Sequence, residues 1–362
     1  MSVDGTVPPQ DAVWSSAALA HFREEILAHE AHQLNTGWED VLVPLGLELA
    51  GRAFGDATMR AWVRTWVEYH LGVATVRQSV ESYRPQRSGE PLRGVVLSPY
   101  CGEWGVAMVL ALVEHPRAME AAREIADHIC DDGLRARDGA LLHGPFSLRV
   151  WVDTLYYSAV PLARVYAATG EERYAREAIR QCLLHAEHLR DPSTGDFVHD
   201  ADPVTGQRTA SPWSRGNGWI VMALADTLRH IPHEMHGWSE VMETYRSLVA
   251  AMIRVQHPSG LWRIVPGNDE AHLETSGSAM IATGIAVGLA EEWLDPSLAG
   301  AVQRTWRELP GWIDKGGRLQ GCQTPAGHGG WETHKKSSLG SRTYGDGSLL
   351  RLAAELRGAA LI

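Results

Sequence analysis

The sequence is poor in cysteine, in basic residues and in long apolar runs. Its 362 residues include four cysteines and no Cys-x-x-Cys pair, which excludes a small disulfide-bonded secreted fold. Lysine and arginine number 33 against 44 aspartates and glutamates, and the formal charge of −11 excludes nucleic-acid binding through the whole surface. No stretch approaches the ~20 apolar residues of a membrane span, and residues 1–14 do not resemble a signal peptide. We therefore expect a cytoplasmic protein with reduced cysteines and neither a nucleic-acid nor a membrane partner.

Phenylalanine is also scarce, whereas tryptophan is abundant. The chain has 4 Phe, 9 Tyr and 14 Trp. Because Phe fills a core as well as Trp does, this bias suggests flat amphipathic faces at a surface or cleft, of the kind that binds sugar rings. Large spacers between packed helices would produce the same bias, and composition alone favours that explanation.

Helical periodicity recurs along the whole chain, and strand-like alternation is confined to short runs. The pattern predicts twelve helices, at residues 14–32, 39–54, 57–71, 101–114, 117–131, 153–168, 172–189, 217–230, 237–256, 275–292, 297–308 and 345–358. Several are joined by turns too short for anything but antiparallel neighbours. The helices therefore pair into six hairpins.

A degenerate repeat lies between the hairpins. Each repeat has a glycine followed by a short apolar run, at Gly139, Gly195, Gly260 and Gly317. A repeat of about 60 residues indicates stacked or closed helical hairpins, and six hairpins close an (α/α)6 toroid. We predict such an all-α toroid, with short β excursions in its loops, as a single domain over residues 1–362. Segments 84–97 and 316–347 are expected to form loops over one mouth.

The first candidate site segment is a loop that runs into a predicted helix with Asp153 in its first turn. A carboxylate at this position is most often a helix cap, and spacing alone favours that role. The neighbouring Trp151 and Tyr156 favour another role, because burial against them would raise the pKa of Asp153 and keep it protonated as a general acid. The partial positive charge of the helix N-terminus would lower the pKa of Asp153 instead.

The second candidate segment crowds aromatic and polar groups at the start of another predicted helix. It contains Trp213, Arg215, Asn217 and Trp219 within seven residues. Tryptophan faces stack on sugars, asparagine pairs with hydroxyl groups, and arginine grips a carboxylate in a bidentate fashion. A structural salt bridge at Arg215 is the alternative, but the crowding favours a binding site.

Five motifs together resemble the unsaturated rhamnogalacturonyl hydrolases, which belong with the unsaturated glucuronyl hydrolases among the (α/α)6-barrel glycosidases. The motifs are Trp151–Tyr156, His199, Trp213–Trp219, Glu274–Ser278 and Tyr344–Gly347. In order and rough spacing the resemblance covers most of the chain from about Trp38 to Leu352. It is most specific in the stretch Trp-x-Arg-Gly-Asn-Gly-Trp.

The resemblance implies a substrate whose non-reducing end is a 4,5-unsaturated uronic acid, left by a polysaccharide lyase. Enzymes of this kind hydrate the vinyl ether instead of displacing the aglycone directly. Asp153 is implied as the acid that protonates C4 and then, as carboxylate, activates the water. The resemblance also implies substrate contacts at His143, His199, Trp213, Arg215, Asn217, Trp219 and Tyr344. No cofactor is expected.

One position departs from the family pattern. Family members usually carry a second aspartate where this chain has Leu97–Tyr100. A like-charged neighbour is one device that keeps a catalytic acid protonated, so its loss removes part of the argument for Asp153. Glu103 is the expected substitute and a further expected contact in the binding site. Asp200 and Asp202 are alternatives near His199.

Metal chemistry and two other functions are alternatives to the hydrolase. The histidine pairs 29/32 and 233/236 lack the His-Glu-x-x-His pattern, so no metal site is expected. A sugar epimerase or isomerase on the same toroid would use two opposed histidines, for which His143 and His199 are candidates. A non-catalytic carbohydrate-binding protein is the third possibility.

Overall fold

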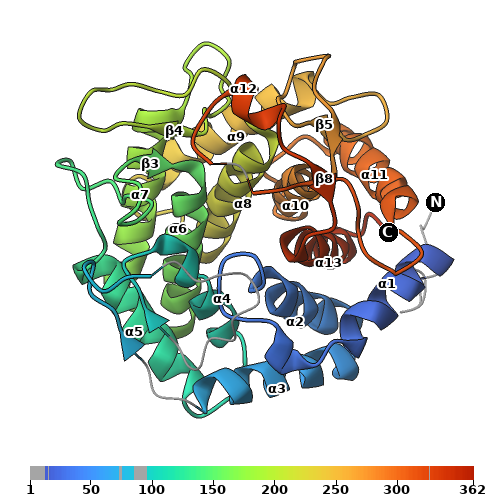
Figure 1. The fold of residues 1–362 in the computed structure, drawn as a ribbon, viewed down its shortest axis with the longest axis horizontal. Helices are drawn as coiled ribbons and strands as arrows, with labels where there is room; N and C mark the ends of the chain where they lie inside the picture. The colour runs from blue at the N-terminus through green and yellow to red at the C-terminus, as the bar shows by residue number, and fades with distance from the viewer. Residues whose placement is uncertain (1–12, 15, 73–75, 85–95, 326) are drawn as a thin grey trace.

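The helices of the chain form two concentric rings around a central axis (Figure 1). The computed structural model describes residues 13–14, 16–72, 76–84, 96–325 and 327–362. The inner ring consists of α2 (Leu42–Phe54), α4 (Val106–Leu110), α6 (Val152–Thr169), α8 (Ser214–His230), α10 (Thr275–Ala290) and α13 (Thr343–Gly358). The outer ring consists of α1 (Ala17–Ala28), α3 (Ala57–Leu71), α5 (Ala118–Asp131), α7 (Glu172–Leu189), α9 (Trp238–Arg254) and α11 (Ala299–Glu308). The predicted (α/α)6 toroid is confirmed.

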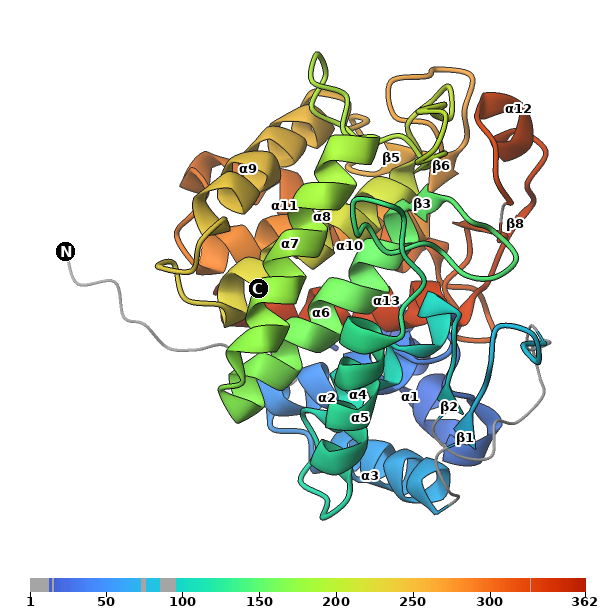
Figure 2. The same cartoon turned by 90° about the vertical axis from the view of Figure 1, so that its left-hand side faces the viewer.

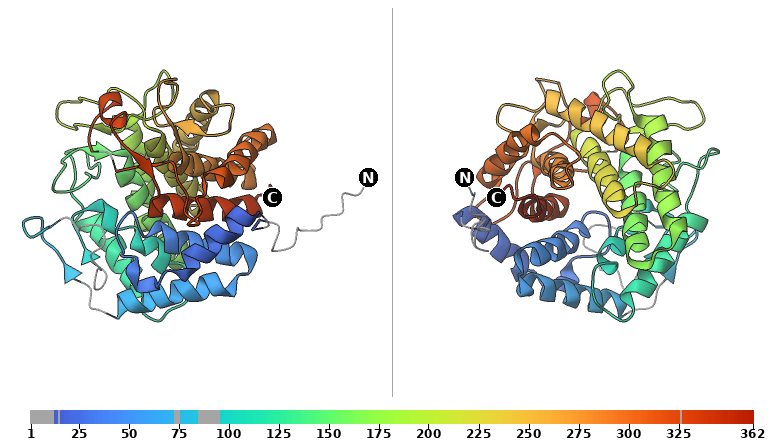
Figure 3. Two further views of the ribbon diagram at one scale, coloured as in Figure 1. Left: turned by 45° about the vertical axis from the view of Figure 1, so that its right-hand side comes forward. Right: turned by 180° about the vertical axis from the view of Figure 1, so that it is seen from behind.

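The ring closes where α13, at the C-terminal end of the chain, packs against α2 near the N-terminal end. Gly46 and Gly347 face each other at this contact. A Cβ on Gly46 would lie 2.6 Å from the Gly347 carbonyl oxygen, so the two helices approach at a distance that only small residues allow. Figure 3 shows the same two rings from the opposite end. Inner helices are buried on almost every side, whereas outer helices bury one face.

The short strands lie together at one end of the toroid (Figure 2). They form four two-stranded sheets: β1 (Val76–Arg77) with β2 (Val96–Leu97), β3 (Val150–Trp151) with β4 (Asp200–Ala201), β5 (Trp262–Arg263) with β6 (Leu273–Glu274), and β7 (Cys322–Gln323) with β8 (Leu339–Gly340). The helix α12 (Trp331–His334) lies at the same end. The predicted loop segment 316–347 is therefore at this mouth, while most of 84–97 lies outside the described residues.

The glycine repeat is confirmed as a repeated turn. All four glycines have the positive φ that L-residues avoid, with values of 97° at Gly139, 85° at Gly195, 101° at Gly260 and 69° at Gly317. In each turn the glycine N–H donates to a carbonyl three or four residues earlier. The repeat thus turns the chain back toward the mouth after an outer helix.

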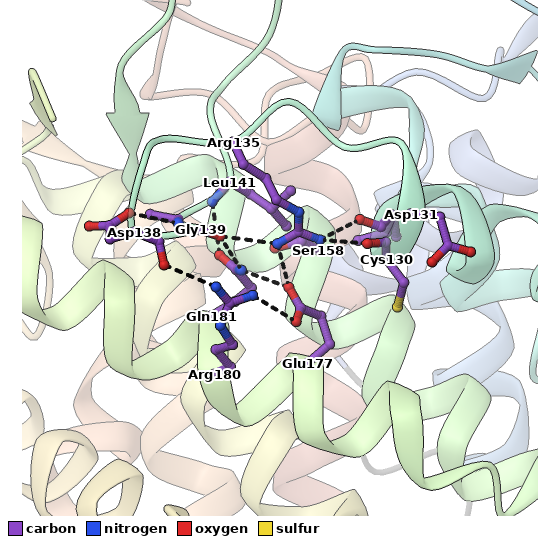
Figure 4. Close-up of polar contacts among 12 residues, drawn as sticks. Cys130, Asp131, Arg135, Asp138, Gly139, Leu141, Ser158, Glu177, Arg180 and Gln181 are labelled. Carbon is purple, nitrogen blue, oxygen red and sulfur yellow. Dashed lines mark hydrogen bonds and ion pairs between the residues drawn. The ribbon is translucent and has the colours of Figure 1, made fainter. Parts of the chain in front are cut away.

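A polar network joins the loop that contains the first of these turns to side chains of α7 (Figure 4). Arg135 donates to the carbonyls of Ile129 and Gly139 and pairs with Glu177 at 2.6 Å. Gln181 donates to the same Gly139 carbonyl and accepts from the backbone N–H of Leu141. The network holds the extended segment that leads directly into His143, where Arg135 and Leu141 form an isolated β-bridge.

Helix boundaries differ from the prediction at three places that matter for the site. The predicted helix 101–114 is interrupted: a 3₁₀ turn, η3 (Cys101–Glu103), precedes the five-residue α4. Helix α8 begins at Ser214 and α13 at Thr343, two or three residues before the predicted starts, so Arg215 and Tyr344 lie in first helical turns. Three more 3₁₀ turns are η2 (Ala31–Gln33), η4 (Pro296–Leu298) and η5 (Leu309–Trp312). No helix in the described part of the chain is long and apolar enough to cross a lipid bilayer.

Candidate active site

A cavity of about 220 Å³ opens at the strand end of the toroid. It is lined by one carboxyl, one guanidinium and a set of aromatic side chains: Trp38, Tyr100, His143, Phe146, Trp151, Asp153, Tyr157, Trp213, Arg215, Pro325 and Gly327. Ligand cavities commonly measure about 300–1,000 Å³. This cavity is smaller and therefore suits the terminal unit of an extended ligand better than an internal one. A larger hollow of about 620 Å³ lies between Trp238 and Trp293 on the outer ring. Its one carboxyl, Glu243, is exposed, so the chemistry points to the smaller cavity.

Asp153 lies in the first turn of α6, directly after β3. No side chain caps this helix by a hydrogen bond, and the buried Oδ2 of Asp153 has no hydrogen-bond partner. The side chain is 13% exposed. The expected cap role is therefore not the one the structure favours, because the carboxyl lies in the cavity with an unused oxygen.

Burial raises the pKa of Asp153 to about 6. The positive charge of Arg215 opposes this rise in pKa, as do the backbone N–H of Asp153 and the indole N–H of Trp219. The Trp219 indole nitrogen acts through proximity, since it makes no hydrogen bond of ordinary geometry. The negative charge of Asp200 raises the pKa further. The carboxyl is thus protonated below about pH 6.

Two buried histidines contact the indole of Trp151, which ends β3. His143 stacks on it in parallel at 4.0 Å, and His199 meets it edge-on at 4.7 Å. Nε2 of His199 lies 3.9 Å from Oδ2 of Asp153. Burial lowers the pKa of His143 to about 3 and holds the pKa of His199 well below its usual value. Both rings are neutral at physiological pH and offer hydrogen bonds without charge.

Arg215 carries a buried positive charge that forms no ion pair with a carboxylate of the described residues. Its side chain is 1% exposed, and the guanidinium lies 4.4 Å from the ring of Trp213 and 4.8 Å from the ring of Tyr344. Nη1 donates to the backbone carbonyl of Gln323 at 2.8 Å, while Nε has no partner. In the described part of the chain no carboxylate forms an ion pair with it, so the alternative of a structural salt bridge is wrong. The charge is available to an anionic ligand.

Tyr344 supports this arrangement from behind. Its hydroxyl donates to the Gln323 carbonyl, and its ring stacks on Trp38 at 5.3 Å. The ring is fully buried and is not among the residues that line the cavity. The structure therefore places Tyr344 against Arg215 instead of in the predicted substrate contact.

Asn217 and Trp219 also have structural partners in place of the predicted sugar contacts. The Asn217 amide donates to the carbonyls of Phe197 and Trp213 and accepts from the Phe197 N–H, with all three distances between 2.8 and 2.9 Å. Trp219 is fully buried against Tyr156 and Tyr157. The amide of Asn217 is fully used by backbone groups, whereas Trp219 buries its ring and leaves its indole N–H, near the Asp153 carboxyl, without a hydrogen-bond partner.

The structure does not place Glu103, the expected substitute for the missing second acid, beside Asp153. Glu103 is 5% exposed, and burial raises its pKa to about 7, but it does not line the cavity. Its charge acts on Tyr83 and Tyr100, whereas the carboxylate that acts most strongly on Asp153 is Asp200. Asp200 is fully buried and bound by Arg149 and by His328. It lies on β4, paired with the strand that leads to Asp153.

Known proteins share this fold and these sequence features. A model of glycosyl hydrolase family 88 matches residues 94–358, which is most of the chain. The chain belongs to glycosyl hydrolase family 88. It is 28% identical over 174 residues to an unsaturated rhamnogalacturonyl hydrolase of Bacillus subtilis, covering 46% of this chain and 51% of the relative. An unsaturated 3S-rhamnoglycuronyl hydrolase of Formosa agariphila is 25% identical over 245 residues, or 62% of each chain.

Solved structures agree on the fold. A possible member of glycoside hydrolase family 105 from Klebsiella pneumoniae superposes with a TM-score of 0.81 at 18% identity, covering 99% of this chain and 95% of the other. Unsaturated glucuronyl hydrolase from a Bacillus species gives a TM-score of 0.64 at 19% identity, covering 89% and 86%. The family 88 chain spans about half to three fifths of the length of the curated relatives it matches.

One buried residue of this family 88 site has no signal in the sequence. Gln323, on β7, accepts from the Trp213 indole N–H at 2.6 Å, and its backbone carbonyl accepts from Arg215 and from the Tyr344 hydroxyl. Its own N–H donates at 3.0 Å to Glu274, the residue that caps α10. Gln323 therefore holds Trp213 and Arg215 in place without lining the cavity. A lone glutamine in a glycine-rich loop gives no pattern from which this role could be read.

Gln323→Leu is expected to raise KM for an anionic sugar substrate about tenfold, with a smaller change in kcat. The substitution leaves the buried indole N–H of Trp213 unpaired, which costs about 1–3 kcal/mol, and lets the ring shift. Ser337→Ala is the matched control. The amide nitrogen of Gln323 donates to the Ser337 hydroxyl at 3.0 Å, so this substitution removes one hydrogen bond of Gln323 and keeps its bond to the Trp213 indole. Steady-state kinetics checks this. Unchanged KM and kcat in Gln323→Leu would exclude the positioning role.

The pH dependence separates the candidate second acids. Asp200→Asn should lower the pKa of Asp153, since it removes the negative charge that raises it, and should move the alkaline limb of the kcat/KM profile to lower pH. Glu103→Gln should leave the limb in place. Asp202→Asn is the control, because its carboxylate accepts from the N–H groups of an exposed turn. A limb that moves with Glu103→Gln and not with Asp200→Asn would restore the original assignment.

Proposed function

We propose that this family 88 protein removes a 4,5-unsaturated uronic acid from the non-reducing end of lyase-generated oligosaccharides. The observation that carries the proposal is Asp153: a buried carboxyl with a raised pKa and an unused oxygen, in a cavity shared with the unneutralised Arg215. The names of the relatives, unsaturated rhamnogalacturonyl and 3S-rhamnoglycuronyl hydrolases, support the same substrate class. A cytoplasmic location remains a prediction from the sequence.

In this mechanism the side chains divide binding from chemistry. Arg215 binds the C6 carboxylate of the uronate, and Trp213 lies against the ring. The carboxylic acid of Asp153 donates its proton to C4, and the positive charge spreads over C5 and the ring oxygen. A water molecule adds at C5 and returns a proton to the Asp153 carboxylate. The hemiketal then opens, and the resulting C1 hemiacetal releases the remaining sugar as its alcohol and becomes an aldehyde.

Substrate binding favours the protonated acid. The charge of Arg215 lowers the pKa of Asp153 in the free protein. The negative charge of a bound uronate offsets the effect of Arg215 and so raises the pKa of Asp153. The neutral histidines His143 and His199 do not oppose this effect. The complex therefore keeps the acid protonated at higher pH than the free protein does.

Incubation with an unsaturated uronyl disaccharide tests the proposal. We expect the ultraviolet absorbance of the conjugated alkene to disappear while the second sugar appears in stoichiometric amount. An epimerase or isomerase would retain the alkene and release nothing. A non-catalytic binding protein would leave both the absorbance and the disaccharide unchanged.

A further inference from the structure

A thiol, a hydroxyl and an imidazole nitrogen meet beside the cavity. The atoms are Sγ of Cys101, Oγ1 of Thr154 and Nδ1 of His143, and they form a triangle. Its sides are 3.6 Å (Sγ–Oγ1), 3.3 Å (Oγ1–Nδ1) and 3.4 Å (Sγ–Nδ1). Cys101 and Thr154 are fully buried and do not line the cavity, whereas the ring of His143 does. The chemistry proposed for Asp153 uses neither the thiol nor the hydroxyl.

The three residues come from separate segments, and the backbone and one indole fix the position of the His143 ring. Cys101 begins η3, and Thr154 lies in the first turn of α6. The N–H of Cys101 donates to the His143 carbonyl at 3.4 Å, and the N–H of His143 donates to the Arg149 carbonyl at 3.0 Å. The ring stacks on Trp151 at 4.0 Å. Nδ1 therefore stays at its corner of the triangle.

All three groups of the triangle are uncharged. Burial raises the pKa of the Cys101 thiol and lowers the pKa of His143 to about 3. The thiol and the hydroxyl each carry one proton to donate, and the neutral imidazole carries one proton on either of its two nitrogens. In the part of the chain that the structure describes, neither the thiol nor the Thr154 hydroxyl has a hydrogen-bond partner outside the triangle.

Counting protons decides which nitrogen of His143 carries its hydrogen. A proton on Nδ1 would bring three donors, N–H, O–H and S–H, to a triangle in which only oxygen and sulfur accept. One donor would then be buried without an acceptor, which costs stability. With Nδ1 unprotonated, the Cys101 S–H donates to Oγ1 and the Thr154 O–H donates to Nδ1. A ring turned over about its Cβ–Cγ bond would place carbon at this corner and again leave one donor unpaired.

We propose that Thr154 and Cys101 hold His143 in its Nε2–H tautomer, so that this residue presents a hydrogen-bond donor and no base to the cavity. Nε2 has no hydrogen-bond partner among the described residues, and the ring lines the cavity. Its N–H is thus available to an oxygen atom of the bound uronate. The inference rests on the proposed function for the identity of that acceptor. Thr154 is a positioning residue, because it acts on the ligand through His143.

The fixed tautomer limits what His143 can do in a reaction. Its one lone pair is on Nδ1, where it is buried and occupied by the Thr154 hydroxyl. A histidine in this state cannot remove a proton from a sugar carbon, as one of the two opposed histidines of an epimerase must. It also cannot activate the water, so that step is left to the Asp153 carboxylate.

Nuclear magnetic resonance of the protein labelled with nitrogen-15 histidine tests the tautomer. The resonances of His143 are assigned by their loss in His143→Gln. In the parent protein at neutral pH we expect a protonated Nε2 and an unprotonated Nδ1 that accepts a hydrogen bond. This measurement needs no variant of the triangle, and a proton on Nδ1 would overturn the proposal.

Thr154→Val tests the role of the hydroxyl. The substitution leaves only the thiol, a weaker donor, beside Nδ1. We expect the Nδ1 resonance to move toward that of a free lone pair, and we expect Thr154→Ser to restore it. Thr283→Val is the matched control, because it removes a hydroxyl that is equally buried on the inner helix α10. An Nδ1 resonance that Thr154→Val does not move would overturn the positioning role.

Kinetics separates this inference from the proposed function. For an unsaturated uronyl disaccharide, Thr154→Val should lower kcat/KM about fivefold, whereas Thr154→Ser and Thr283→Val should stay close to the parent protein. An unchanged kcat/KM in Thr154→Val, with the Nδ1 resonance moved, would overturn the contact between His143 and the uronate. If the parent protein does not turn over the disaccharide, the proposed function fails, and the resonances of His143 still decide the tautomer.

Discussion

Asp153→Asn should lower kcat for an unsaturated uronyl disaccharide by a factor on the order of 10³ or more. An amide of the same shape cannot protonate C4 and cannot later accept a proton from water. The carboxyl contacts only its own backbone N–H in the α6 N-terminus, a contact that the asparagine amide oxygen can keep, so circular dichroism should show an intact fold. Loss of alkene absorbance over time measures the rate. Activity within a few-fold of the parent protein would remove Asp153 from the mechanism.

The folding stability of Asp153→Asn should depend less on pH than that of the parent protein. The pKa of Asp153 is about 6 in the folded protein and about 3.9 in an unfolded chain. Between these values the native state retains a proton that the unfolded state has released, so the parent protein loses stability as the pH rises. Asparagine does not titrate, and the stability of Asp153→Asn relative to the parent should grow by up to about 3 kcal/mol between about pH 4 and pH 7.5. Denaturant titrations at both pH values measure this change.

Arg215→Ala should lower kcat/KM for the unsaturated uronate by about 10²–10³ and should affect the neutral methyl ester far less. The loss follows from removing a buried cation from a carboxylate, an effect of about 2–5 kcal/mol in desolvated pairs. The pKa of Asp153 should also rise, because Arg215 lowers it in the parent protein. Rates with the acid and its methyl ester, measured across pH, test both effects.

Trp213→Ala is the comparison variant for Arg215→Ala. An aromatic wall recognises the ring more than its double bond or its charge, so its loss should weaken binding of saturated and unsaturated sugars, and of acid and ester, to similar extents. Equal penalties for acid and ester in Arg215→Ala would show that the arginine has only a structural role.

The fold could be predicted because its determinants are local and periodic. Each outer helix has one buried and one exposed face, which gives a helical period in the sequence. Helices α3 and α7 begin and end at the predicted residues. The sequence pattern places the starts of α8 and α13 too late because Arg215 and Tyr344, polar or bulky residues beside glycines, do not continue an apolar stripe. The sequence does not reveal the interruption before α4, because Cys101–Leu110 is apolar enough to predict one helix.

The site could be predicted only where a side chain itself carries the chemistry. Asp153 and Arg215 meet in one cavity with His143 and Trp213, which the motifs indicated. The amide of Asn217 suits hydroxyl groups and so predicts a sugar contact, but its sequence neighbours do not reveal that the backbone of Phe197 occupies it. Contacts between segments more than a hundred residues apart, such as Trp213 with Gln323, depend on the closed ring and leave no trace in a single sequence.

The most direct test of vinyl ether hydration by Asp153 is the reaction, in D2O, of an unsaturated uronide whose glycosidic oxygen is replaced by sulfur. Protonation at C4 breaks no bond at C1, so sulfur at C1 should not block the hydration step. The account predicts that the alkene absorbance disappears, that the product carries one deuterium from solvent at C4, and that Asp153→Asn abolishes both. An S-linked substrate that persists with its alkene intact, while the O-linked counterpart is consumed, would contradict it.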